Sequence, residues 1–335
     1  MNIIENISGK TVAVTGADGF IGSHLSELLV QSGARVRALV YYNSWNELGW
    51  LGDAQQSLVD QMELVNGDIR DTELIRKFVK GCDYVFHLSS LIAIPYSYEA
   101  PRSYIDTNVM GAINVLQACR DSDSLTRLVH VSTSEVYGTA QQVPISESHP
   151  LVGQSPYSAS KIAADKMAES FYLSFGLPVV TARPFNTFGP RQTARAVIPT
   201  IASQLAAGAS KLTLGALHPT RDFNYATDTA AGMLALGLCP AAAGKVVNIG
   251  SGEEWSIGET AKILCELSGR EVEIQTDDNR IRPENSEVFR LLADNCLIHE
   301  LTGWKSRVSF RDGLSNTLEW IQRNKHLFNP ERYSK

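Results

Sequence analysis

The sequence predicts an α/β protein in which a doubly wound parallel sheet is followed by a smaller, discontinuous α/β lobe. The first half alternates short apolar, β-rich runs with helical patterns, as strands joined by right-handed crossovers require. A glycine-rich turn joins the first of these runs to the first helical pattern. After Asn186 the alternation loosens, and turn residues, arginines and an amphipathic helix follow. These three observations indicate a large sheet domain and a smaller, discontinuous lobe.

The individual elements follow from residue type and periodicity. Apolar runs bounded by turn residues predict strands, and they cover residues 11–16, 35–42, 62–68, 82–89, 127–133, 178–185 and 245–252. Helical patterns cover about 19–32, about 101–120, a long stretch that begins at "SPYSASK", and in the late region about 256–268 and 312–323. We therefore expect a dinucleotide-binding domain over 1–185 with about 222–250, and a substrate lobe over 186–221 and 251–335.

Composition narrows the class of protein. The 335 residues, 44% of them hydrophobic, suffice for one large unit or for two domains that share a cleft. A net charge of -6 argues against nucleic acid as the main partner. The five cysteines are odd in number, widely spaced and without a C-x-x-C pair, which indicates reduced thiols in a cytoplasmic protein. The sequence predicts no signal peptide, no membrane span and no metal site.

The turn "TGADGFIGSHL" places Gly16, Gly19 and Gly22 between the first strand and the first helix. Glycine allows the backbone to approach a pyrophosphate, and the helix N-terminus stabilises the anion. A tight strand-to-helix turn without a ligand is the alternative, but the position in the first unit of a doubly wound sheet favours a Rossmann-type dinucleotide site. The predicted contacts in this turn are Gly16, Gly19, Phe20, Ile21 and Gly22.

Further cofactor contacts are expected at the ends of strands two to four. The second strand ends in "LVYYNSW", which lacks the acidic residue that usually binds the ribose of NAD, so the choice between NAD and NADP stays open. Arg37 lies within that strand rather than beyond it. A solvated turn is the alternative for "NGDIRD". The predicted contacts are Asn43, Ser44, Asp68, Ile69, Leu88 and Ser89.

Two clusters predict acid/base chemistry. Tyr157 and Lys161 are four residues apart on one predicted helix and therefore face the same way. A nearby ammonium group and a cationic nicotinamide favour the phenolate, which makes this tyrosine a usable acid/base. "VSTSEVYG" places Thr133, Ser134 and Glu135 at a strand end, where burial of a carboxylate is costly unless it has a task. A capping turn is the alternative explanation of this cluster.

The order of these motifs resembles the extended short-chain dehydrogenase/reductase superfamily. "STSEVYG", "SPYSASK", "RPFNTFGPRQ" and "TRDFNY" resemble its nucleotide-sugar epimerase/dehydratase branch. "VYYNSWNELGW", "IPYSYEAPRSYIDTN" and "ARAVIPT" are similar to 4,6-dehydratases of nucleotide-linked N-acetylglucosamine in legionaminic-acid-type pathways. The resemblance implies a carbohydrate-biosynthesis lyase with NAD slightly favoured over NADP. It also implies a homodimer through a four-helix bundle, although the lobe alone could cover the apolar helix faces.

The resemblance further implies a role for each catalytic residue. Thr133 and Tyr157 would act at the sugar 4-hydroxyl while hydride moves to the cofactor, and Glu135 would remove the C5 proton before water leaves C6 and the hydride returns there. Glucose-type dehydratases carry an aspartic acid where this chain has Ser134, so either Glu135 serves both proton transfers or an ordered water assists. A 4-epimerase would leave Glu135 unexplained. The sequence also allows a UDP-glucuronate decarboxylase, or a cofactor-sensing regulator that has lost catalysis.

Substrate contacts follow from the same resemblance. The substrate would be UDP- or GDP-N-acetylglucosamine, held by residues of the late lobe and by one loop of the sheet domain. For each arginine a solvated salt bridge is the alternative, for the tyrosine and serine an ordinary aromatic loop anchor, and for Asn248 a simple strand end. The expected contacts are Tyr96, Ser97, Asn186, Arg191, Arg221, Asn248 and Arg282.

Overall fold

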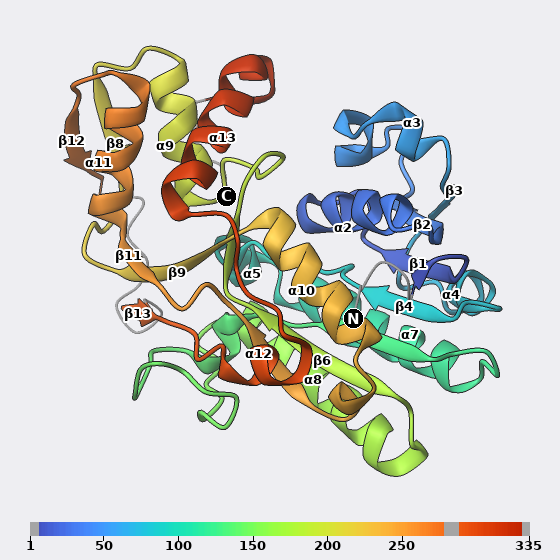
Figure 1. The fold of residues 1–335 in the computed structure, drawn as a ribbon. Coiled ribbons are helices and arrows are strands. Elements are labelled where there is room, and N and C mark those ends of the chain that lie inside the picture. The colour runs from blue at the N-terminus through green and yellow to red at the C-terminus, as the bar shows by residue number, and fades with distance from the viewer. Residues whose placement is uncertain (1–6, 278–287, 330–335) are drawn as a thin grey trace.

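The computed structural model describes residues 7–277 and 288–329 and has a parallel sheet at its centre (Figure 1). Seven strands run in the order β10-β6-β5-β4-β1-β2-β3, and every neighbouring pair is parallel. The doubly wound sheet predicted from the sequence is confirmed. Its strands are β1 (Thr11–Thr15), β2 (Arg35–Tyr41), β3 (Glu63–Gly67), β4 (Tyr84–His87), β5 (Arg127–Val131), β6 (Val179–Pro184) and β10 (Val246–Ile249).

Helices cover both faces of this sheet (Figure 1). One face carries α2 (Phe20–Gln31), α10 (Ala226–Leu238) and α12 (Cys296–Thr302). The other carries α4 (Thr72–Val79), α7 (Gly111–Arg120) and α8 (Pro156–Phe175). The strand order reverses between β1 and β4, so the carboxyl ends of these two strands open a crevice of the kind that binds ligands in such sheets.

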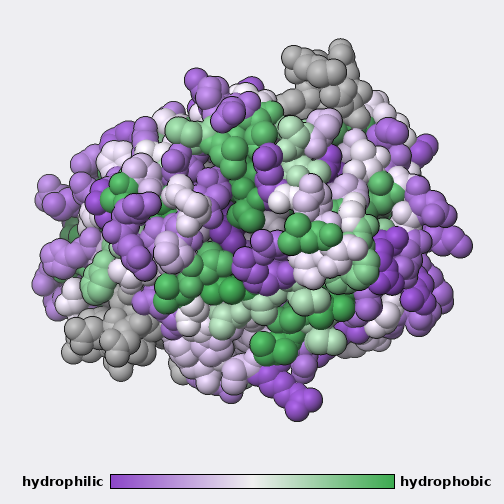
Figure 2. Space-filling view, turned by 90° about the horizontal axis from the view of Figure 1, so that it is seen from below, coloured by the Kyte–Doolittle hydropathy of each residue, from purple (hydrophilic) through white to green (hydrophobic). Residues whose placement is uncertain are grey.

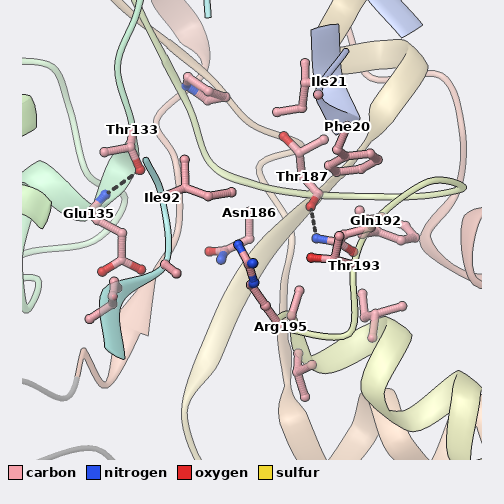
Figure 3. A pocket seen from close by; sticks show the side chains of 18 of the residues that line it. Phe20, Ile21, Ile92, Thr133, Glu135, Asn186, Thr187, Gln192, Thr193 and Arg195 are labelled. Carbon is pink, nitrogen blue, oxygen red and sulfur yellow. Dashed lines mark hydrogen bonds between the residues drawn. The ribbon is translucent and has the colours of Figure 1, made fainter. Parts of the chain in front are cut away.

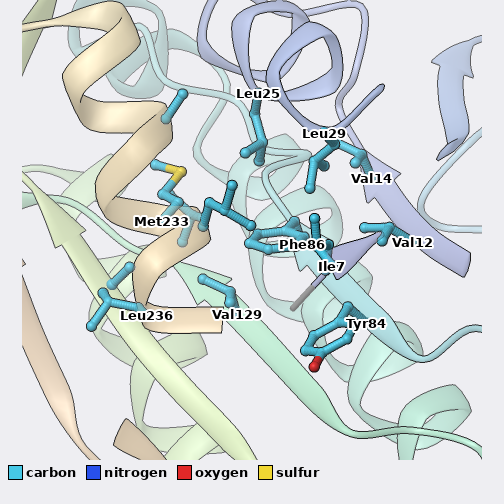
Figure 4. Close-up of a cluster of buried hydrophobic side chains, with 14 of the residues drawn as sticks. Ile7, Val12, Val14, Leu25, Leu29, Tyr84, Phe86, Val129, Met233 and Leu236 are labelled. Carbon is cyan, nitrogen blue, oxygen red and sulfur yellow. The ribbon is translucent and has the colours of Figure 1, made fainter. Parts of the chain in front are cut away.

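The central strand β1 shows why the run "TVAVT" predicted a buried strand. Val12 and Val14 pack in one cluster with Phe86 of β4 and with the helices α2 and α10 (Figure 4). Ala13 points to the opposite face and joins the cluster beneath α4, α7 and α8. Both faces of β1 are therefore excluded from water, which favours apolar residues at every position. This double burial fixes the position of the glycine turn that follows β1.

The helix predicted over 101–120 is one helical path with an irregular middle. It consists of α6 (Pro101–Tyr104), a π-helical segment Ile105–Met110 and α7. Within the π segment, the side chain of Asn108 accepts from the Leu91 amide at 2.8 Å and donates to the Leu91 carbonyl and to Ser160 Oγ, each at 3.0 Å. This amide ties the loop after β4 to α8, two of the elements that border the site.

The second lobe is built around aromatic residues. Phe310 stacks on Phe223 and on Trp255, with ring centroids 5.4 and 5.0 Å apart, and it meets Phe188 edge to face. The segment 222–225, expected in the dinucleotide domain, is part of β9 and pairs within this lobe. The lobe contains β7 (Asn186–Phe188), α9 (Val197–Ala206), β8 (Lys211–Leu214), β9 (Thr220–Tyr225), β11 (Glu254–Ser256), α11 (Ile257–Ser268), β12 (Glu273–Thr276), β13 (Arg290–Leu291) and α13 (Phe310–Arg323).

Short helices complete the connections, and the surface carries some apolar side chains. The short helices are η1 (Gly49–Asp53), α3 (Gln56–Val59), α5 (Ile94–Glu99), η3 (Ser134–Tyr137), η4 (Pro240–Ala242) and η7 (Lys325–Leu327).

Figure 2 shows the molecule from below, with apolar side chains gathered in patches among hydrophilic ones. No helix in the described part of the chain is long and apolar enough to cross a bilayer. All five cysteines lie in the described ranges as free thiols.

Candidate active site

A cavity of about 900 Å³ lies between the carboxyl ends of the central strands and the second lobe. Its wall includes the glycine turn, the ends of β4 and β5, the start of α8, and residues of β7, β9 and the loop before α9. Figure 3 shows Thr133 and Glu135 on one wall, with Asn186 and Arg195 across from them. A large concave site at the switch point of a doubly wound sheet is the expected place for a cofactor and a substrate.

The glycine turn is packed so closely that two of its positions exclude any larger residue. Gly16 has a φ of +69°, and a Cβ there would lie 2.9 Å from the amide nitrogen of Ser89. A Cβ on Gly22 would lie 1.9 Å from the carbonyl oxygen of Gly16. Gly19 caps α2 without any side-chain hydrogen bond to the helix. The first residues of α2 border the cavity and no side chain caps their amides, an arrangement that fits a pyrophosphate.

Gly22→Ala should disrupt this turn. We expect the affinity for NAD⁺ to fall roughly tenfold or more, because overpacking of this kind costs about 1–3 kcal/mol and here displaces the backbone that would hold the pyrophosphate. Titration calorimetry of the whole protein with NAD⁺ measures the effect. Gly52→Ala is the matched control, since a Cβ at Gly52 meets nothing within 4 Å. Equal affinities of the two variants would show that the turn does not hold the cofactor.

The strand-end cluster combines the two interpretations that the sequence allowed. Thr133 caps the short helix η3, and its Oγ1 accepts a hydrogen bond from the Glu135 amide at 3.2 Å. Thr133, Ser134 and Glu135 also border the cavity. The capping turn at the end of β5 thus places these three residues on the cavity wall.

The Tyr157–Lys161 pair comes from the first turns of α8. Ser155 and Ser158 form a capping box that starts this helix next to the cavity. Tyr157 borders the cavity, and Lys161 Nζ donates to the carbonyl oxygen of Val131 at 2.7 Å. Burial raises the pKa of Tyr157, and this outweighs a hydrogen bond from Thr133 that lowers it. Burial also lowers the pKa of Lys161 to about 8.

A buried ionic network supports Lys161 from behind. Asp165 lies one turn further along α8 and accepts hydrogen bonds from Arg183 Nε and Nη2 at 3.1 and 2.9 Å. His130 Nε2 lies 3.4 Å from the second oxygen of Asp165. Burial alone would raise the pKa of Asp165, but His130 and Arg183 hold it below its usual value. Because the histidines are scattered along the sequence, they are predicted to be structural residues. No local sequence pattern predicts the contacts among His130, Asp165 and Arg183.

The second lobe contributes polar groups to the opposite wall. Asn186 borders the cavity, and its Oδ1 is buried without a hydrogen-bond partner among the described residues. Arg195 lies beside it (Figure 3), and within the described chain its guanidinium has no ion-pair partner. Arg221 also borders the cavity and donates to the Thr220 carbonyl at 2.9 Å. The wall therefore offers an amide and two guanidinium groups to a polar, anionic ligand.

Most of the predicted site residues border the cavity. They are Gly16, Gly19, Phe20, Ile21, Gly22, Leu88, Thr133, Ser134, Glu135, Tyr157, Asn186 and Arg221. Lys161 and Ser89 lie directly behind this wall, where Lys161 bonds the end of β5 and Ser89 backs Gly16. Arg282 lies outside the described residues.

Several other predicted contacts have partners elsewhere. Asn43 closes its own loop, because its side chain bonds the backbone of Tyr41, Trp45 and Glu47. Asp68 forms an ion pair with Arg70. Ser44, Ile69 and Tyr96 are not among the residues that border the cavity.

The remaining predicted substrate contacts are engaged in the fold. Arg191 Nη1 lies 2.6 Å from Glu27 Oε2, which joins the loop after β7 to α2. Asn248 is fully buried and accepts a hydrogen bond from the Tyr137 hydroxyl at 2.7 Å. Ser97 donates to the Ile94 carbonyl at 2.6 Å within α5.

Many other residues of the cavity wall were not predicted, and Asp18, Arg195 and Trp50 are three of them. Asp18 lies within the glycine motif at a position that the motif leaves free, and Arg195 lies in the quoted stretch "ARAVIPT". Trp50 also borders the cavity, and its ring meets Trp320 of α13 edge to face at 5.6 Å. The charges of Asp18 and Arg195 were the available signals, but a charge on a turn does not reveal its direction. Over the described ranges, no cluster of three or more His, Cys, Asp or Glu residues could hold a metal ion.

Comparison with known proteins places this architecture among nucleotide-sugar enzymes. Residues 13–317 match the family model described as GDP-mannose 4,6-dehydratase. A dTDP-glucose 4,6-dehydratase from Actinoplanes is 31% identical over 94% of this chain and 98% of that protein. A protein named putative UDP-glucose 4-epimerase from Methanocaldococcus jannaschii is 30% identical over 93% of this chain and 99% of its own length.

The likeness extends to solved structures. The dTDP-glucose 4,6-dehydratase DesIV from Streptomyces venezuelae, solved with NAD bound, superimposes with a TM-score of 0.85 at 29% identity. The alignment covers 96% of this chain and all of that one.

Proposed function

The chain belongs to the NAD-dependent epimerase/dehydratase family of extended short-chain dehydrogenases/reductases, and from that premise we propose that it is a nucleotide-sugar 4,6-dehydratase. The proposed substrate is UDP- or GDP-N-acetylglucosamine, and the product is its 4-keto-6-deoxy derivative. The observation that carries the proposal is the placement of Glu135 on the same cavity wall as Thr133 and Tyr157. Elimination of water needs a base for C5 besides the group at O4, and Glu135 supplies a carboxylate for it.

In the proposed mechanism each catalytic side chain handles a proton at a defined atom. Tyr157, assisted by the Thr133 hydroxyl, takes the proton of the sugar 4-hydroxyl, and the Lys161 ammonium behind it favours the phenolate. A bound nicotinamide dinucleotide supplies the hydride acceptor for C4 and the hydride donor for C6. The C4 ketone acidifies the C5 proton, which Glu135 removes while hydroxide leaves C6 and is protonated. The net change is the loss of one water, which makes the enzyme a hydro-lyase.

The proton for the leaving 6-hydroxyl needs a donor. Ser134 is 2% exposed, borders the cavity and lies next to Glu135, but an alcohol is a poor acid near neutral pH. Glu135 gains the C5 proton in the same step and can pass it to the leaving hydroxyl directly or through an ordered water. In this proposal Ser134 orients the leaving group by a hydrogen bond.

The opposite wall would hold the nucleotide diphosphate. Arg195 and Arg221 present positive charge to the cavity, and the buried Oδ1 of Asn186 accepts from a hydroxyl of the substrate. Planar guanidinium groups suit phosphate oxygens because they can donate two parallel hydrogen bonds. This charge complements the phosphates of a nucleotide sugar.

A panel of UDP-, GDP- and dTDP-linked sugars, analysed by mass spectrometry after incubation with the enzyme, tests the proposal. We expect an N-acetylglucosamine nucleotide to lose the mass of one water. An unchanged mass with inverted configuration at C4 would instead establish a 4-epimerase, for which Thr133, Tyr157 and Lys161 suffice. Loss of carbon dioxide from a uronate would establish a decarboxylase.

Arg195 keeps the decarboxylase as the second candidate. A guanidinium without an ionic partner in the described chain could pair with the carboxylate of a glucuronate as well as with a phosphate. The panel separates the two, because only the decarboxylase would require a sugar carboxylate for turnover.

Arg195→Gln should weaken substrate binding. Loss of a charge-assisted hydrogen bond costs about 1.5–3 kcal/mol, so we expect the KM for the nucleotide sugar to rise roughly 10- to 100-fold while kcat changes little. Steady-state kinetics across substrate concentration measure both parameters. Arg307→Gln, at an arginine outside the cavity wall, is the control for a general change of charge. A KM equal to that of the native enzyme would remove Arg195 from the binding site.

The resemblance also leads us to propose a homodimer through helices on the α7–α8 side. Four apolar residues on this side are exposed, namely Ile105 (46%), Met110 (48%), Leu173 (73%) and Phe175 (54%). Apolar groups of this size on one helical layer are typical of a surface that a partner covers. A second copy of the chain is the partner that the resemblance implies.

A further inference from the structure

The end of β2 lacks the group that usually recognises the cofactor ribose. In doubly wound dinucleotide sites an acidic side chain beyond the second strand binds the ribose hydroxyls. Here the strand ends in Tyr41 and Tyr42 follows it, and these residues are 59% and 66% exposed. Asn43 uses its amide to close its own loop. None of these three side chains can supply a carboxylate to a ribose.

A carboxylate from a different segment, the glycine turn, lies at the end of β2. Asp18 lies between Gly16 and Gly19 in the glycine turn and borders the cavity. Its Oδ2 accepts a hydrogen bond from the backbone amide of Tyr41 at 3.0 Å. The carboxylate is therefore bound to the backbone of β2 at its last residue, the point from which an acidic side chain would usually extend.

The position of Asp18 is fixed from a second side as well. Its carbonyl oxygen accepts a hydrogen bond from the Trp50 amide at 2.9 Å. A Cβ on Gly49 would lie 2.6 Å from the same oxygen, so the segment that follows β2 fits closely over Asp18. Two backbone contacts and the glycine turn thus hold the residue in place, as a ligand-binding carboxylate requires.

We propose that Asp18 binds the 2′-hydroxyl of the adenosine ribose and selects NAD over NADP. Carboxylate oxygens have lone pairs beyond the one used by the Tyr41 amide, and these accept from a ribose hydroxyl. A 2′-phosphate would bring two negative charges against the same carboxylate. The inference rests on the dinucleotide site of the proposed function, but not on the sugar or on the reaction.

The arginines near the end of β2 support the preference for NAD over NADP, because both are bound to other groups. Arg37 is held at the far end of β2, because its Nε lies 2.7 Å from Glu63 and its Nη1 donates to the Phe78 carbonyl at 2.7 Å. Arg70 interacts electrostatically with Tyr41, but Asp68 binds its guanidinium. A 2′-phosphate would have to detach Arg70 from Asp68 and still face Asp18.

Titration calorimetry with NAD⁺ and with NADP⁺ tests the proposal on the whole protein after bound nucleotide has been removed. We expect the native protein to bind NAD⁺ roughly 100-fold more tightly than NADP⁺. Asp18→Asn keeps an acceptor for the Tyr41 amide and removes the charge. It should weaken NAD⁺ roughly tenfold and bring the two affinities to within about tenfold of each other.

Asp60→Asn is the matched control, because Asp60 is an exposed carboxylate in the segment after β2 and does not border the cavity. The control should retain the native ratio of the two affinities. Native protein that binds NADP⁺ as tightly as NAD⁺ would overturn the proposal, as would an unchanged ratio in folded Asp18→Asn. If Asp18→Asn does not fold, the ratio of the two affinities in the native protein alone tests the proposal. Failure to bind either dinucleotide would instead refute the proposed function, and a sugar other than N-acetylglucosamine would leave the ratio unaffected.

Discussion

Glu135→Gln should abolish dehydration while leaving the oxidation at C4 possible. Formation of the 4-keto-6-deoxy product is expected to fall by about 10²- to 10⁴-fold, the usual contribution of a positioned acid or base. The amide preserves the shape of the side chain but cannot take the C5 proton. Mass spectrometry of the nucleotide sugar measures the loss. The absorbance of reduced nicotinamide should rise during turnover, because the hydride taken from C4 is no longer returned.

Tyr157→Phe provides the contrast for this experiment. Without the phenol the C4 hydroxyl keeps its proton, so neither product nor reduced nicotinamide should accumulate. The two variants thus fail at different steps of one reaction, and each serves as the control of the other. Full dehydration by Glu135→Gln would exclude this carboxylate from the mechanism and would require another base for the C5 proton.

The candidate catalytic cluster could be predicted because its geometry is local in sequence. Tyr157 and Lys161 need only a helix to face the same way, and Thr133 and Glu135 need only the end of a buried strand. The parallel sheet then brings both segments to one edge, as the structure shows. The fold was predictable for a similar reason, since buried parallel strands require apolar runs that are visible in the sequence.

The arginines illustrate what local pattern cannot predict. Arg191 and Arg195 lie in the same short run, "GPRQTAR", and either could have faced a phosphate. Glu27, 164 positions away in the chain, binds Arg191 and commits it to the contact between the loop and α2. Arg195 lies four residues further on, just before α9, and faces the cavity. Only the tertiary contact separates the two roles.

Asp18 and the π segment were unpredictable for the same physical reason. The glycine motif fixes three positions and leaves Asp18 unspecified, and its role follows from a hydrogen bond to Tyr41 on another strand. The sequence predicts a helix over about 101–120, but its periodicity does not reveal the π segment, in which Asn108 bonds a loop outside the helix. In each case a polar side chain binds a partner that the local sequence does not name.

Asp165→Asn should destabilise the fold by about 3–5 kcal/mol, the usual cost of removing one partner from a buried ion pair. Arg183 and Asp165 are each 3% exposed, so the variant would leave a buried guanidinium without its counter-charge. The free energy of unfolding from denaturant titration measures the loss. Glu169→Gln is the matched control on the same helix, because the exposed pair of Glu169 with Lys166 should contribute at most about 1 kcal/mol. Similar losses in both variants would contradict a buried ionic anchor.

The double replacement Asp165→Asn with Arg183→Met separates the cost of an unpaired charge from the worth of the pair. Removing both charges leaves no uncompensated ion, so we expect the double variant to be more stable than Asp165→Asn alone by at least about 1 kcal/mol.

The pKa of Lys161 should not recover in the double variant, because Asp165 is the charge that raises this pKa. In both variants that pKa should fall from about 8, and less of the ammonium would remain near neutral pH to favour the Tyr157 phenolate. Stability restored without activity would therefore show that Asp165 supports Lys161 electrostatically as well as holding α8 against β6.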